Sequence, residues 1–502
     1  MTETVDKAKS FAYFVYPFLF DLPDAPSPER KTANSSSPDP FSIFAGRIAE
    51  TTLENKRIWT DWGIPVNDLM PHVARFLDPD PKNKKPTGRF WQLSNDVAQK
   101  LQTNKIVWRM LRGKTGTPIP FTLGGDFAVQ LALFRHGVGF ITVSAQPVSN
   151  ELDAWLAFLH DFRFMSHRSD VRVCAERETY DPVSKQKSTS PYNPLNVPLS
   201  ANDNSFYFIE VIKAFLNASG IVIKKDKEVF TPGHTLPYTS LFVRGVAEND
   251  KPTILHRLRN FFGPEQGSNT SPDDLCPNHA ANLAYARDQW FLQTLNGGSF
   301  LSFDDENTPG NDFQNNDLSK HTGGVYFCAN LLVLYQRFTL ARLSERVATK
   351  ALEDGTDKEW ETIRDDLLDF TARGHFAQAM QSDHHHRYYR KWQEVLQIPQ
   401  LYEEVRNEVR DMYERAVFRL RQEDDKREKR EEDREKLVAK RLSLFGLLFA
   451  IPALILAFLG VNIREYPSGL PLMVVSSWFL GGFVLAALAY WILVKFWDRE
   501  TT

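Results

Sequence analysis

The sequence LSLFGLLFAIPALILAFLGV, residues Leu442–Val461, decides how this chain is organised. These twenty residues carry no charge, and Ser443 has the only polar side chain among them. As a helix rising 1.5 Å per residue they would extend about 30 Å, which is the thickness of the hydrocarbon core of a bilayer. We therefore predict a transmembrane helix over 442–461.

A second uncharged run follows at 470–494, interrupted only by two serines and a tyrosine hydroxyl. The link between the runs, 462–469, is too short for a domain and contains the turn formers Pro467 and Gly469. The two runs therefore predict a tight antiparallel hairpin in the lipid bilayer. A pair of buried core helices is disfavoured because both runs lack charges.

The flanking charges predict the orientation of this hairpin. Basic residues flank its outer ends, namely Lys436, Lys440 and Arg441 before the first run and Lys495 and Arg499 after the second. By the positive-inside bias, we expect a multi-pass protein of the cell inner (plasma) membrane, with its N-terminus and its 495–502 tail in the cytoplasm. Three widely spaced cysteines are typical of a reducing compartment, in agreement with a cytosolic N-terminal region.

Small residues recur along one stripe of the first predicted span, at steps of three and four: Ser443, Gly446, Ala450, Ala453, Ala457 and Gly460. Such a stripe allows close packing of helices in lipid. It also suits an oligomer in which this face surrounds an axial path. The pattern is compatible with both interpretations.

The residues before the first span predict a long charged helix. No proline or glycine occurs from Tyr402 to Arg441, and residues 421–436 are charged at every position except Gln422. We expect a stalk helix over 396–441 that continues into the first span, giving one helix of about sixty residues. A solvated single helix and a bundled stalk both fit this pattern.

Residues 1–395 predict a cytosolic domain of mixed α and β structure. Strands are expected at Phe11–Phe20, Gly88–Leu93 and Ser240–Val243, together with a hairpin around Arg135-His136-Gly137. Helices are expected from an N-cap at Ser149 through Phe162 and at 205–217, 280–295, 325–352, 358–372 and 375–396. The fold class is therefore an α+β cytosolic domain, a stalk helix and a two-helix C-terminal transmembrane hairpin.

Motifs for enzymatic chemistry are missing from the sequence. Gly113-Lys114-Thr115 resembles the end of a phosphate-binding loop, but Trp108 stands where that loop needs its first glycine. The consecutive histidines 384–386 point around a helix instead of toward one metal ion, so we expect a solvated polar patch. With 60 basic and 63 acidic residues, the balance predicts no nucleic-acid partner. We expect a protein that is not an enzyme.

Gly460-Val461-Asn462 closes the first span, and a short link, a second span and a basic tail follow it. This layout resembles the CorA-like superfamily of divalent-cation channels, whose first membrane helix ends in a Gly-x-Asn motif. The resemblance implies a homopentamer whose first span lines the pore and whose Asn462 binds a hydrated cation, either Mg²⁺ or another divalent ion. The implied ion-pathway residues are Gly460, Val461, Asn462, Ala457, Ala453, Ala450, Gly446 and Ser443, with Glu465 of the outer loop attracting cations.

The resemblance implies two functions. The first is a divalent-cation channel or transporter that is gated by its cytosolic domain. The alternative is a ligand-gated membrane effector of an antiviral defence system, because divergent relatives of this superfamily respond to a nucleotide-type signal and the cytosolic region here is large. That alternative requires a cytosolic small-molecule ligand. A non-conducting membrane scaffold is a third possibility that the sequence leaves open.

Overall fold

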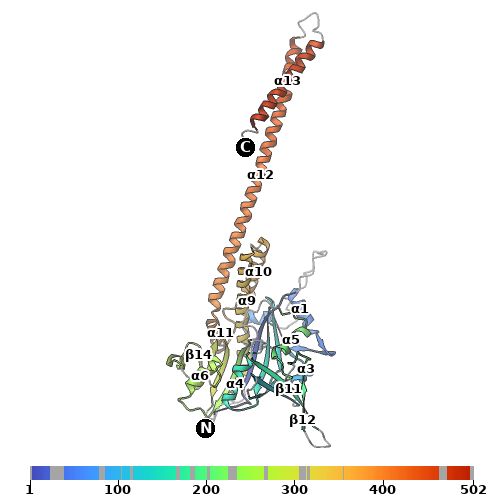
Figure 1. Ribbon diagram of the computed structural model, residues 1–502. Coiled ribbons are helices and arrows are strands. Elements are labelled where there is room, and N and C mark those ends of the chain that lie inside the picture. The colour runs from blue at the N-terminus through green and yellow to red at the C-terminus, as the bar shows by residue number, and fades with distance from the viewer. Residues whose placement is uncertain are drawn as a thin grey trace. The chain divides into compact units, whose positions relative to one another are not determined.

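The computed structural model describes residues 3–22, 39–77, 85–102, 105–113, 117–164, 170–180, 187–200, 204–223, 234–264, 270–304, 313, 317–353, 356–462 and 472–497. The chain divides into two compact units, Met1–Met412 and Tyr413–Thr502. The first unit has mixed α and β structure, as the sequence predicts (Figure 1).

A large, mostly antiparallel sheet organises the first unit. Its main path runs, in order, through β12 (Lys187–Tyr192), β11 (Val171–Tyr180), β7 (Ile106–Arg112), β8 (Ile119–Leu123), β10 (Val138–Pro147), β2 (Phe11–Leu19), β13 (Leu236–Arg244), β16 (Gly297–Phe303), β15 (Gln289–Thr294) and β14 (Asn282–Ala286). Four strands pair beside this path: β1 (Thr4–Val5), β5 (Trp59–Asp61), β6 (Gly88–Leu93) and β9 (Val129–Phe134). A separate small pair joins β3 (Thr52–Leu53) to β4 (Lys56–Arg57).

Strand β2 lies inside the sheet because both of its faces are apolar. Successive side chains of a strand point to opposite faces, so Tyr13 and Phe14 face opposite layers. Phe14 contacts Phe162, with ring centroids 4.7 Å apart, whereas Tyr13 contacts Phe327 at 5.0 Å. Helices therefore cover the sheet on both sides, and a strand covered on both faces reads as a continuous apolar run.

The helices of the first unit are interspersed with the strands along the chain, and four of the described helices follow the last described strand. In order they are α1 (Pro40–Ala49), α2 (Pro71–Leu77), α3 (Asn95–Gln102), α4 (Leu152–Phe162), α5 (Phe208–Ala218), α6 (Lys251–Asn260), α7 (Pro272–Leu275), α8 (Leu318–His321), α9 (Phe327–Leu352), α10 (Asp357–Arg373) and α11 (Asp383–Val395). A 3₁₀ turn lies at Val66–Asp68, and a π-helical turn at Thr322–Tyr326 leads through Phe327 into α9. The predicted helices at 325–352 and 358–372 are confirmed within two residues of their bounds.

The predicted helix at 280–295 is wrong. These residues form the antiparallel pair β14–β15, and Asp288 in the turn has a φ of 60°, which a helix interior does not allow. The side chains of Phe291 and Leu292 are buried in the sheet.

Three helix starts also differ from prediction. Glu151, and not Ser149, is the N-cap residue of α4, although the Ser149 hydroxyl accepts a hydrogen bond from the Glu151 N–H at 3.1 Å. Helix α5 begins at Phe208 because Tyr207, its N-cap, is still extended. Helix α11 begins at Asp383 and not at His375, because Met380 is held in a β-bridge with Leu69.

A buried polar network joins α9 to α11. Gln336 donates from its carboxamide nitrogen to the Gly374 carbonyl at 3.0 Å and to the Tyr389 hydroxyl at 2.9 Å. Gln393 donates to the side-chain oxygen of Gln336 at 3.1 Å and to the Phe376 carbonyl at 3.0 Å. Since the three side chains are buried and bonded to one another, the network fixes the register of the two helices.

The second unit contains most of one long helix and all of another. Helix α12 covers Ile398–Asn462, which is 65 residues, and α13 covers Leu472–Trp497. The single long helix expected from the sequence is confirmed. In the part of the chain that the structure describes, no helix is both long and apolar enough for a membrane span. Residues 463–471 and many side chains of the two predicted spans lie outside that description, so the membrane hairpin stays a prediction.

Candidate functional site

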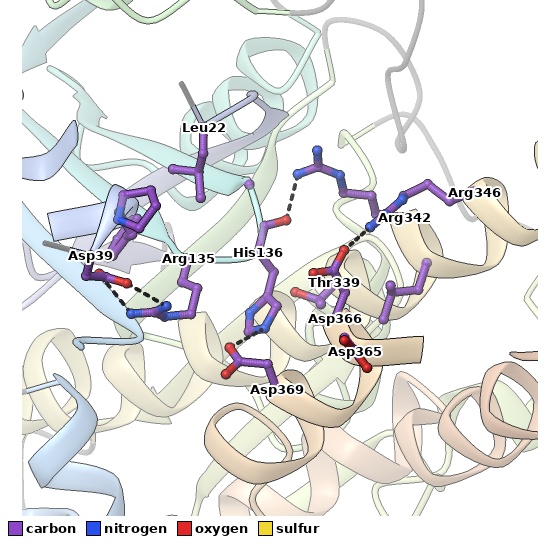
Figure 2. Close-up of a pocket in the computed structure, with 14 residues that line it drawn as sticks. Leu22, Asp39, Arg135, His136, Thr339, Arg342, Arg346, Asp365, Asp366 and Asp369 are labelled. Carbon is purple, nitrogen blue, oxygen red and sulfur yellow. Dashed lines mark hydrogen bonds and ion pairs between the residues drawn. The ribbon is translucent and has the colours of Figure 1, made fainter. Parts of the chain in front are cut away.

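Half of the residues that line a cavity of about 470 Å³ in the first unit have charged side chains. We call it the charged cavity. It lies where the turn between β9 and β10 meets α1, α9 and α10 (Figure 2). Its lining residues are Leu22, Asp39, Pro40, Phe41, Arg135, His136, Gly137, Thr339, Arg342, Leu343, Arg346, Asp365, Asp366 and Asp369.

Glycine is required at the tip of the β9–β10 turn. Gly137 has a φ of 72°, in the left-handed region that L-residues with a side chain avoid. A Cβ at this position would also collide with the Arg342 guanidinium and with the Phe20 carbonyl oxygen. The missing side chain lets Arg342 donate from Nη1 to the backbone oxygen of His136 at 2.6 Å and to that of Phe20 at 3.2 Å.

Arg135 and Asp39 form one wall of the charged cavity. The guanidinium donates to both carboxylate oxygens, at 2.9 and 3.0 Å, and Figure 2 marks both bonds with dashed lines. Only 14% of the Arg135 side chain and 5% of the Asp39 side chain are exposed, so this is a buried bidentate pair. Asp39 also accepts from the Ser42 N–H at 3.0 Å and so caps α1.

His136 lies at the centre of the site. Its Nδ1 lies 2.7 Å from the Tyr335 hydroxyl, and its Nε2 lies 3.4 Å from Oδ2 of Asp369 without hydrogen-bond geometry. Burial lowers the pKa of His136, and the nearby Asp369 carboxylate only partly opposes this effect. We therefore treat the imidazole as neutral at neutral pH.

Opposite charges face the cavity from α9 and α10. Arg342 and Arg346 lie one turn apart on α9, and Arg346 forms an ion pair with Asp366 of α10 (Figure 2). Arg342 donates from Nη2 to Asp21 at 3.2 Å. Arg346 also lines a second cavity of about 200 Å³ between the same two helices.

The charged cavity presents groups of both signs to a ligand. The lining contains three guanidiniums, four carboxylates and one neutral imidazole. The described lining contains no cysteine, and its one hydroxyl group belongs to Thr339. That hydroxyl makes no hydrogen bond to a described residue. The cavity volume lies in the range of about 300–1,000 Å³ that is usual for small-molecule sites.

The sequence does not predict this site. Arg135-His136-Gly137 predicts only the turn of a hairpin, and residues 325–352 predict only a helix. The charged side chains of the two segments meet only in the folded chain.

The predicted ion-pathway residues all lie in α12. The small side chains of Ser443, Ala450, Ala453 and Ala457 are exposed, and Gly446 has nothing within 4 Å of its missing Cβ. Gly460, Val461 and Asn462 lie in the last turn of α12, and the positions of their side chains are outside the described residues. Glu465 is also outside the described residues.

The three consecutive histidines are not a solvated patch as a whole. His385 is buried, its ring centroid lies 4.9 Å from that of Tyr326, and burial lowers its pKa against the effect of Asp68. That part of the prediction is wrong, because α11 turns this one histidine inward. Within the described residues, no group of three histidine, cysteine or acidic side chains could hold a metal ion.

Comparisons with models of known families, with curated proteins and with solved structures give no match to this chain.

Proposed function

We propose that this chain is a membrane protein whose copies assemble, as a homopentamer, into a channel or transporter for divalent cations of the Mg²⁺ type. The first unit forms the cytosolic gate, and the C-terminal helices cross the inner membrane. The observation that carries the proposal is the continuity of α12 from Ile398, in the first unit, to Asn462 of the Gly-x-Asn motif.

The exposed small-residue face of α12 supports this proposal. One face of the helix carries only small residues: Gly446, Ala450, Ala453 and Ala457. These residues are exposed in the single chain. A face of this kind allows close approach of neighbouring helices around an axis. The carboxamide of Asn462 would hold water of a hydrated cation at the end of that axis, because Mg²⁺ releases its water reluctantly.

Cation flux tests the proposal directly. The full chain is reconstituted into liposomes that contain a fluorescent Mg²⁺ indicator, and the initial influx is measured per unit of incorporated protein. We expect flux well above that of empty liposomes and a reduction of at least about tenfold in Asn462→Ala, corresponding to about 1.4 kcal/mol. Asn217→Ala makes the same chemical change at an exposed position of α5 and is expected to leave the flux unchanged.

Flux that is no greater than in empty liposomes would refute conduction. Equal flux in Asn462→Ala and the unchanged chain would refute the role of the Gly-x-Asn motif.

The alternative is a ligand-gated membrane effector, which the charged cavity of the first unit favours. In that case flux would depend on a cytosolic small molecule. A highly anionic nucleotide fits the cavity poorly, since Arg135, Arg342 and Arg346 are each already paired with a carboxylate. The same liposomes, tested with cyclic and linear nucleotides on the cytosolic side, decide this alternative: a nucleotide-dependent rise in flux supports it, and flux unaffected by every nucleotide excludes the nucleotide-type signal.

A further inference from the structure

We propose that the charged cavity binds a small zwitterion of the free α-amino acid class, with its carboxylate at Arg342 and Arg346 and its ammonium group at Asp365, Asp366 and Asp369. This inference does not rest on ion conduction, because it concerns binding to the first unit alone.

The arginines of α9 supply the anion-binding end. Arg346 and burial both lower the pKa of Arg342, burial being the larger cause, so the two positive charges are close enough to repel each other. In the described residues Arg346 pairs with Asp366 through Nη1, so its Nε and Nη2 protons are open to a ligand or to water. A carboxylate between the two guanidiniums would accept these protons and relieve the repulsion.

The acidic residues of α10 supply the cation-binding end. Asp366 uses one carboxylate oxygen for Arg346, and Asp365 uses one for Arg364. Each of the two therefore keeps an oxygen that can accept from an ammonium group. Asp369 is shared by His136 and by Arg373, whose Nε lies 3.1 Å from its Oδ1.

One residue of the lining has a buried hydroxyl without a partner in the described part of the chain. Thr339 lines the cavity and is 1% exposed, yet its Oγ1 has no hydrogen-bond partner among the described residues. Leaving a buried hydroxyl unpaired costs about 1–3 kcal/mol, so the cavity is destabilised at this position.

The charge balance selects the class of ligand. The lining has four carboxylates against three guanidiniums, and Asp21 and Arg373 add one charge of each sign around it. A dianion would have to displace existing ion pairs, and a dication would leave the guanidiniums of α9 without a new partner. A divalent metal ion lacks a ligand set in the described residues. A molecule with one charge of each sign pairs with the arginines of α9 and with the aspartates of α10, and it leaves the net charge of the cavity unchanged.

Binding measurements test the inference on the full chain in detergent. Isothermal titration calorimetry is performed with each of the common L-amino acids, with succinate as the dianion probe and with putrescine as the dication probe. We expect at least one amino acid to bind with a Kd below about 1 mM and the two probes to bind at least about tenfold more weakly.

Substitutions then locate the site. Arg346→Gln and Asp365→Asn each remove one end of the proposed ligand contact and are expected to weaken amino-acid binding at least about tenfold. Glu361→Gln, an exposed position of α10 outside the cavity lining, is the matched control and is expected to bind like the unchanged chain. The thermal unfolding midpoint of each variant shows that it is folded.

Three results would overturn the inference. They are the absence of amino-acid binding up to about 10 mM, binding that survives both Arg346→Gln and Asp365→Asn, and binding of succinate or putrescine as tight as that of the amino acids. None of these results depends on flux, so the channel proposal stands or falls separately.

Discussion

At the scale of single residues, Gly137 has a role that its neighbours in the turn do not share. It combines a left-handed backbone with the close approach of Arg342, so any side chain meets both a strained φ and a collision. Two effects of different origin act at one position, and a matched glycine can separate them. Gly220 has the same φ of 72° but nothing within 4 Å of its missing Cβ.

We therefore expect Gly220→Ala to lower the free energy of unfolding by about 1–2 kcal/mol, the cost of the left-handed conformation. Gly137→Ala is expected to lose about 3 kcal/mol or more, because the Arg342 hydrogen bonds to Phe20 and His136 are also displaced. Urea unfolding of the full chain in detergent, followed by tryptophan fluorescence, measures both changes. If both variants lost the same free energy of unfolding, the Arg342 hydrogen bonds would contribute nothing to stability.

The residues of the charged cavity also show why the sequence did not predict it. They come from five segments that are separated in the chain: Leu22, Asp39–Phe41, the 135–137 turn, α9 and α10. None of these segments carries a local motif, and the cavity exists only because the sheet brings the turn against the two helices. A single sequence contains no signal for that juxtaposition.

At the scale of elements, α10 begins with a reciprocal cap. The Thr356 N–H and hydroxyl both donate to the Glu359 carboxylate, at 2.8 and 3.0 Å, and Lys350 of α9 lies 2.7 Å from the same group. These contacts lower the pKa of Glu359 to about 2, with Lys350 as the largest cause. The cap holds the start of the helix that supplies the acidic side of the cavity.

Removing the cap is expected to loosen α10 locally. Thr356→Ala should destabilise the helix by about 1 kcal/mol, giving faster amide hydrogen exchange in peptides from 357–373. Thr362→Ala is the control within the same helix, because its hydroxyl only bonds back to the Lys358 carbonyl at 2.8 Å and its loss costs little. Unchanged exchange in Thr356→Ala would show that the cap does not hold the helix.

Elements with a strong periodic signal were predicted well. The long helix α12, the strands β2 and β6 and the helices α9 and α10 follow from their patterns of apolar and charged residues. The β14–β15 hairpin was missed because Leu283, Ala286 and Trp290 recur at steps of three and four, as on one face of a helix. The left-handed conformation of Asp288 separates the two alternatives. The local sequence does not determine that conformation, since aspartate is common in both settings.

At the scale of the whole molecule, the central prediction is assembly in a membrane. The protein is expected to remain with the membrane fraction after an alkaline carbonate wash, since two apolar helices hold it there. After extraction in mild detergent, its mass measured by light scattering, corrected for bound detergent, should be five times the 57.6 kDa of one chain. A protein released by carbonate, or one that is monomeric in detergent, would contradict the proposed pore.

The Gln336–Tyr389–Gln393 network has a consequence for how this protein can evolve. The three side chains bond to one another, so a single replacement leaves buried side-chain donors or acceptors unpaired. Exchanging all three together for apolar residues leaves no side-chain group unpaired and removes donors only from the Gly374 and Phe376 carbonyls. The path between these two stable solutions passes through less stable intermediates. The three positions are therefore expected to co-vary. Natural variants of this protein should keep all three residues or replace all three.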